Sequence, residues 1–150
     1  SLGILPILTV FIPMLMDTGG NSGSQSSVTV IRALSLDELH FKDIFTVIWK
    51  EVRAAALCAI ALAAVCFGKV MLVDRLLMGN TSVTVLVDLT VCLTLAVTVI
   101  VAKVVGCSLP LIAKRFGFDP AVMASPFITT IVDAMSLLLY FLFAKAIMGV

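Results

Sequence analysis

Asp133 is a single carboxylate in the middle of an apolar stretch that is long enough to cross a lipid bilayer. The stretch runs from Ala121 to Val150, and Lys145 near its far end is the only other charged residue in it. A carboxylate at the bilayer centre costs about 2.5–3.5 kcal/mol on insertion scales, and such residues usually mark the path of an ion or a proton. We therefore expect Asp133 to hold a cation or a proton on its way across the membrane.

A stripe of polar side chains accompanies this carboxylate if the stretch is helical. Three of them share one helix face with Asp133 by their spacing of three, four and seven residues: Thr129, Ser136 and Tyr140. Pro126 lies on the same face, where it is expected to kink the helix and free the carbonyl of Val122. Free carbonyl oxygens beside a carboxylate suit a hard cation. For the hydroxyl groups, hydrogen bonding between helices is the alternative role.

A second polar run lies near the start of the chain, DTGGNSGSQSS from Asp17 to Ser27. Its glycines Gly19, Gly20 and Gly23 would let backbone carbonyls face inward. Asn21 and the neighbouring serines add uncharged oxygens, and Asp17 adds charge. Ligand sets made only of oxygen select Mg²⁺, Ca²⁺ or an alkali ion over copper or zinc. The run therefore predicts a second part of a cation site.

The composition is that of an integral membrane protein. The chain is 61% hydrophobic and 13% charged, with a mean hydropathy of +1.22, whereas soluble domains carry roughly 25% charged residues. The net charge of +1 and the lack of a basic block give no support for nucleic-acid binding. None of the four cysteines forms a C-x-x-C motif. The first residue is Ser1, not Met, so we expect the sequence to begin inside a longer protein.

Four segments are expected to span the membrane, since a span needs about 20 apolar residues. They are 2–34, 54–77, 83–105 and 120–146, which predicts an all-α membrane fold. The apolar beginning of the first segment, 2–16, reaches only about 22 Å. We expect this helix to be broken at its prolines and glycines, with the polar run enclosed by protein or by a water-filled cavity.

The boundaries of the other spans follow from local signals. An amphipathic connector over 37–53 is expected to lie at the membrane surface before the second span. Gly106 and Pro110 are expected to end the third span. Asp119 is predicted to be the N-cap of the fourth helix and Pro120 its first residue.

Two charged residues lie near the ends of their predicted spans. Asp88 lies about 8 Å from the outer edge of its span, either in an outer vestibule or as a carboxylate at the membrane interface. Lys69 is expected to extend its ammonium group to the membrane surface.

The orientation follows from the lysines and arginines in short loops. One side carries seven and the other three, so we expect the first to be cytoplasmic and both ends of the chain to lie outside. The seven are Arg32, Lys42, Lys50, Arg53, Lys103, Lys114 and Arg115, and the three are Lys69, Arg75 and Lys145.

Two motifs resemble one known family. PMLMDTGGNSGSQSSVTVIRAL, from Pro13 to Leu34, resembles the second transmembrane helix of MgtE-type magnesium channels and transporters. FDPAVMASPFITTIVDAMSLLLYF, from Phe118 to Phe141, resembles their last helix. The chain then looks like the last four helices of a five-helix domain, without the first helix and the cytoplasmic domains.

The resemblance implies a homodimer in the cell membrane that conducts Mg²⁺ along the subunit interface. It also implies partner regions in the full-length protein, the cytoplasmic N and CBS domains. The family's ion-binding aspartate matches Asp133, and oxygens of its site match Thr129, Ser125, Gly20 and Gly23. Because Mg²⁺ gives up its water reluctantly, the hydrated ion is expected to be bound.

Other functions remain open at this point. A secondary transporter driven by protons or sodium could use Asp133 or Asp17 for the coupling ion. An intramembrane enzyme could pair the same two aspartates, but the glycine-rich signatures expected around such a pair do not occur, and we expect no enzyme. A subunit that only supports a partner would have no use for the buried carboxylate.

Overall fold

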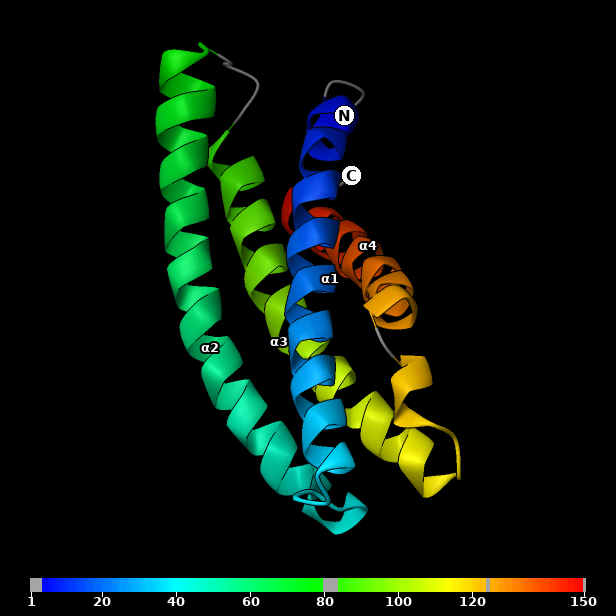
Figure 1. Cartoon of the computed structure of the whole chain (residues 1–150). Helices are drawn as coiled ribbons and strands as arrows, with labels where there is room; N and C mark the ends of the chain where they lie inside the picture. Colours follow the sequence, from blue (N-terminus) through cyan, green and yellow to red (C-terminus); the bar gives the residue numbers. More distant parts are fainter. Residues whose placement is uncertain (1–3, 80–83, 124, 150) are drawn as a thin grey trace.

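The chain forms four long helices. A computed structural model describes residues 4–79, 84–123 and 125–149 (Figure 1). The long helices are α1 (Ile4–Ser35), α2 (Ile44–Lys69), α3 (Val85–Arg115) and α4 (Ser125–Met148). Short helical turns precede α2 (η1, Phe41–Asp43), extend it as a π-helix (η2, Val70–Leu77) and precede α4 (η3, Pro120–Met123). No strand occurs in these residues, which confirms the all-α prediction.

The helices pack around α3. It contacts α1, α2 and α4, and α1 also packs along α4. In Figure 1, α2 lies at one edge of the bundle, and α1 and α4 lie on the other side of α3. The start of α1 and the end of α4 lie toward the same end of the bundle.

Three helical segments are long and apolar enough to cross a membrane. They are Phe41–Leu77, Val85–Arg115 and Pro126–Met148, found among the residues that the structure describes. The expected first span, now α1, is not one of them. It is long enough, at 32 residues, but the polar run from Asp17 to Ser27 occupies its middle.

The prediction of a broken first helix was wrong, because α1 is continuous through both Pro13 and the glycine-rich run. Each glycine costs a helix about 1 kcal/mol relative to alanine. Here the glycines allow close contact with α3 and α4, and this packing outweighs the low helix propensity. A Cβ on Gly19 would lie 2.7 Å from Cγ2 of Thr98 on α3 and 3.0 Å from Oγ of Ser136 on α4.

The backbones of α1 and α3 come into direct contact. The backbone of Gly23 touches Gly106 so closely that a Cβ on Gly106 would overlap the carbonyl oxygen of Gly23. Small residues at such crossings are typical of membrane helices. The prediction that the third span ends at Gly106 and Pro110 was wrong. Both residues are buried inside α3, which continues to Arg115.

Most of the amphipathic connector forms the first turns of α2. Its apolar side packs on the ends of α1 and α3, where Ile44, Val47 and Ile48 contact a buried cluster. The members of that cluster are Val30, Leu34, Cys107 and Leu111. This burial holds the connector against the bundle.

The last helix begins later than expected. Asp119 does cap a turn, with Oδ1 accepting from the backbone N–H of Ala121 at 2.9 Å, but that turn is the short η3. The α-helix starts at Ser125, directly before Pro126. A proline favours the first turn of a helix, where its missing N–H has no partner to lose. The expected kink at Pro126 is therefore absent.

Candidate functional site

Asp133 lies half-buried on α4, next to the backbone of Gly20 on α1. A Cβ on Gly20 would lie 3.6 Å from Oδ1 of Asp133 and 3.1 Å from Cγ2 of Thr129. The structure thus brings together three predicted site residues from two helices that are far apart in sequence. A Cβ here would be in ordinary contact with the carboxylate but would crowd the Thr129 methyl group.

The surroundings of Asp133 are negatively charged. None of the ion pairs in the described part of the chain includes it. The charged group that acts on it electrostatically is Asp17, from α1. Asp17 and Asn21 are both exposed. They are four residues apart and therefore lie on the same side of α1, and Gly20 lies between them in the sequence. Two carboxylates without a cationic side chain favour a bound cation.

The polar stripe on α4 divides into two parts. Thr129 and Thr130 both donate to the carbonyl of Pro126, at 3.0 and 2.9 Å. Further along, Ser136 donates to the carbonyl of Val132 within its own helix, at 2.7 Å. The buried Tyr140 hydroxyl donates to the carbonyl of Leu8 on α1 at 2.9 Å. In the far part of the stripe, Ser136 is thus satisfied within α4 and Tyr140 ties α4 to α1, so only the part near Asp133 is open to a ligand.

Two other predicted ligands have different positions. Gly23 faces α3 and α4, and its carbonyl oxygen is directed at Gly106, so the structure gives it a packing role and does not bring it to Asp133. Ser125 is the first residue of α4, and its side chain lies outside the described residues. Its backbone lies two helical turns before Asp133, about 12 Å along the axis.

A polar groove runs along the exposed side of α1. It has a volume of about 380 Å³ and is lined by Asn21, Ser24, Gln25, Val28 and Thr29. A polar surface of this kind is unfavourable in contact with lipid. Within the described ranges, no group of three or more His, Cys, Asp or Glu residues could hold a metal ion. Over the described residues, a single chain thus presents an open polar face with few side chains that could bind a metal ion directly.

Asp88 is not at a vestibule or a membrane interface, and this prediction was wrong. It is fully buried, with 0% exposure. Its Oδ1 accepts from Sγ of Cys92 at 3.3 Å, while Oδ2 has no hydrogen-bond partner in the described structure. Its place near the start of a helix could not reveal this, because packing against α2 and not depth along the helix determines its burial.

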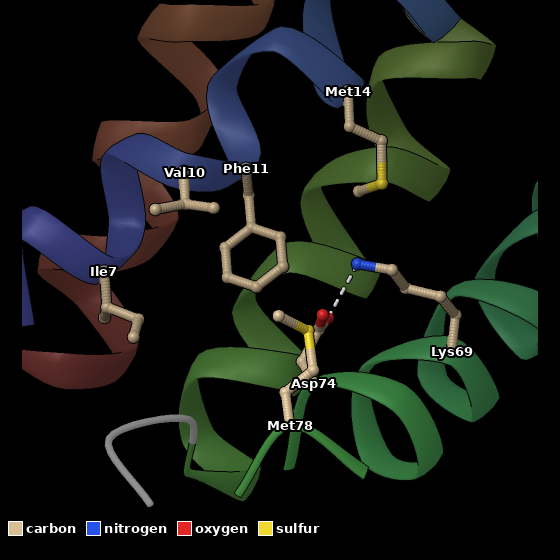
Figure 2. A pocket seen from close by; sticks show the side chains of 7 residues that line it. All are labelled: Ile7, Val10, Phe11, Met14, Lys69, Asp74 and Met78. Atoms are coloured by element: carbon tan, nitrogen blue, oxygen red, sulfur yellow. Dashed lines mark hydrogen bonds and ion pairs between the residues drawn. The ribbon is translucent and has the colours of Figure 1, made fainter. Parts of the chain in front are cut away.

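Lys69 does not extend alone to the membrane surface. Its Nζ pairs with Oδ2 of Asp74 at 2.7 Å and lies 5.9 Å from the ring centroid of Phe11. Figure 2 shows this pair at a cavity of about 180 Å³ between α1 and the end of α2. The remaining lining is apolar: Ile7, Val10, Met14 and Met78. Because Lys69 and Asp74 neutralise each other, this cavity carries no net charge that would attract a cation.

The sequence of the chain is similar to those of known proteins. The profile of a family described as "MgtE: Divalent cation transporter" matches residues 12–143. Three curated proteins named magnesium transporter MgtE are similar to the chain. The protein from Bacillus subtilis (strain 168) is 36% identical over 139 residues, which cover 93% of this chain and 29% of that protein. The protein from Thermus thermophilus is 32% identical over 141 residues, which are 94% of this chain and 29% of that protein.

The third relative, from Enterococcus faecalis, is 31% identical over 142 residues, which are 95% of this chain and 30% of that protein. The chain therefore spans less than a third of the length of the relatives it matches. The apolar helices and these matches together make it a multi-pass membrane protein.

Proposed function

Because the chain belongs to the MgtE family of divalent cation transporters, we propose that it carries Mg²⁺ across the cell membrane along the polar face shared by α1 and α4. One observation carries this proposal. Asp133 is a half-buried carboxylate beside the Gly20 backbone, and no cationic side chain in the described structure neutralises it. The names of the three relatives favour Mg²⁺ as the ion.

The chemistry of the face suits a hydrated ion. Mg²⁺ prefers six oxygens in octahedral geometry and retains several of its waters. Asp133, and Asp17 from α1, would supply charge and accept hydrogen bonds from the water shell, and the uncharged amide oxygen of Asn21 would accept further ones. The backbone carbonyls near Ser125 and Thr129 are further acceptors for these waters. Gly20 would keep α1 close without a side chain in the path.

A second copy of the chain would complete the site. The polar groove beside Asn21 is open on one side, and a single chain offers one central carboxylate. A twofold axis beside α1 and α4 would place two copies of Asp133 opposite each other, which fits the doubled charge of the ion. Regulatory N and CBS domains would belong to the part of the full-length protein that this chain does not include.

The proposal is tested by the driving force of transport. Full-length protein is reconstituted in liposomes with equal pH and equal sodium on both sides, and Mg²⁺ influx is followed with an internal indicator. We expect influx that depends only on the Mg²⁺ gradient and the membrane potential. A requirement for a proton or sodium gradient would favour the coupled transporter instead, and no Mg²⁺ flux under any gradient would refute both.

A substitution at Gly20 tests the α1 part of the face. Gly20→Ala should lower the maximal rate of Mg²⁺ uptake severalfold, because its Cβ would crowd Thr129 at 3.1 Å and approach Oδ1 of Asp133 at 3.6 Å. Gly68→Ala is the matched control, since nothing lies within 4 Å of its added Cβ. Normal uptake by a folded Gly20→Ala variant would place the ion path elsewhere.

A further inference from the structure

Three helices are joined by a network of Ser26, Glu51 and Lys103. Oγ of Ser26 on α1 donates to Oε2 of Glu51 on α2 at 2.6 Å. Nζ of Lys103 on α3 donates to the same oxygen at 3.2 Å and to Oγ of Ser26 at 3.3 Å. In the sequence, Ser26 and Glu51 are 25 residues apart, Glu51 and Lys103 are 52 apart, and Ser26 and Lys103 are 77 apart.

The network is largely removed from solvent. Ser26 is 2% exposed, and the side chains of Lys103 and Glu51 are 15% and 21% exposed. Charge-assisted hydrogen bonds are strong where little water competes. Removing one member of a buried ion pair leaves the other without compensation. The three side chains are therefore expected to keep one fixed arrangement relative to one another.

Ser26 is a residue of the polar run, but it does not belong to the polar face. It follows Gly20 by six residues, which is about one and two-thirds helical turns and about 9 Å along the axis. Its hydroxyl consequently points to α2 and α3, away from Asp133. The sequence suggested an oxygen ligand at this position, whereas the structure gives the hydroxyl two partners within the bundle.

The network bridges a place where α1 and α2 do not pack fully. A cavity of about 170 Å³ lies between these helices, and its lining includes Glu51 and Val30. One turn away, α1 and α3 touch at Gly23 and Gly106. Backbone contact thus sets the distance of α1 from α3, while the bond between Ser26 and Glu51 adds a polar tie to α2 beside the cavity.

We propose that the Ser26–Glu51–Lys103 network positions α1 so that Gly20 remains beside Asp133 in the transporting state. The three are positioning residues, because they do not contact the ion. This inference rests on the proposed function, since it concerns how the Mg²⁺ path is kept in register. Loss of the network changes how fast ions pass and leaves the affinity of the Asp133 site unchanged.

The first test is Ser26→Ala in the full-length protein, which removes the tie to α1 and keeps the ion pair of Glu51 and Lys103. We expect the maximal rate of Mg²⁺ uptake to fall about tenfold, equivalent to about 1.4 kcal/mol, with the half-saturating Mg²⁺ concentration unchanged. Ser35→Ala is the matched control, because this exposed serine on α1 donates to the carbonyl of Arg32 in its own helix. A wild-type rate in Ser26→Ala overturns the inference.

The second test exchanges the charges. Glu51→Gln and Lys103→Gln should each lower the maximal rate, and the double exchange Glu51→Lys with Lys103→Glu should restore most of it, because Ser26 can both donate and accept. Failure of the exchange to restore a folded protein's rate counts against the inference. If the single variants do not accumulate in the membrane, Ser26→Ala alone decides.

Asp133→Asn in the same assay separates this inference from the proposed function. Loss of uptake in Asp133→Asn with normal rates in the network variants would leave the ion site standing and remove the positioning role. Normal uptake in Asp133→Asn with reduced rates in the network variants would remove the proposed ion site and leave the network as the rate-determining element.

Discussion

Asp133→Asn should abolish Mg²⁺ uptake and leave the fold intact. Asparagine has nearly the same size and still offers an oxygen, so the change removes charge and little else. A neutral amide binds the waters around a dication more weakly than a carboxylate does, since charge-assisted hydrogen bonds are about twice as strong as neutral ones. The apparent melting temperature should stay the same or rise, because a charge within the bilayer is unfavourable by about 2.5–3.5 kcal/mol.

Uptake by full-length protein in liposomes, together with thermal unfolding in detergent, provides both measurements. Asp74→Asn is the matched control. Its carboxylate also lies on a long helical segment, but it pairs with Lys69 and is remote from the α1–α4 face, so uptake should be normal. Unimpaired uptake by Asp133→Asn would rule out this residue as the ion site.

Gly106→Ala should strongly destabilise the protein. Replacing glycine by alanine normally stabilises a helix by about 1 kcal/mol, so helix propensity alone predicts a more stable protein. Here the new Cβ would overlap the carbonyl oxygen of Gly23, and a backbone atom cannot turn away as a side chain can. Overpacking typically costs about 1–3 kcal/mol, and we expect the upper end of this range because α1 and α3 must separate.

Thermal unfolding followed by circular dichroism compares this variant with Gly68→Ala. Gly68 also lies inside a long helix, but its added Cβ would meet nothing within 4 Å, so this control should be as stable as the wild type or more stable. A Gly106→Ala protein that melts with the wild type would show that α1 and α3 do not approach as closely as Gly23 and Gly106 indicate.

Composition and segment length predicted the all-α fold because they depend on hydropathy alone. They could not predict that α1 is continuous, since the glycines of its polar run destabilise an isolated helix and become favourable only against α3 and α4. Nor could composition and segment length decide whether the last long helix begins at Pro120 or at Pro126. Asp119 and Pro120 are a sound helix start locally, but Pro126 begins the longer helix.

The candidate site, like the fold, was predictable from the sequence only in part. The neighbours of Asp133 on its own helix follow from spacing, and the resemblance to a family suggested Gly20 as a partner. The orientation of each residue around α1 was not accessible, because it depends on which side the other helices cover. Gly23 and Ser26 lie in the same run as Gly20, yet both face into the bundle.

The length of the second helical segment has a mechanical consequence. Phe41–Leu77 comprises 37 residues without a break, about 55 Å at the usual rise, whereas the hydrocarbon layer is about 30 Å thick. A helical segment of this length must tilt or protrude from that layer. Because Glu51 lies on the same continuous segment as Phe41, a displacement of the Phe41 end would be carried along the segment to the hydrogen bonds that Glu51 makes with Ser26 and Lys103.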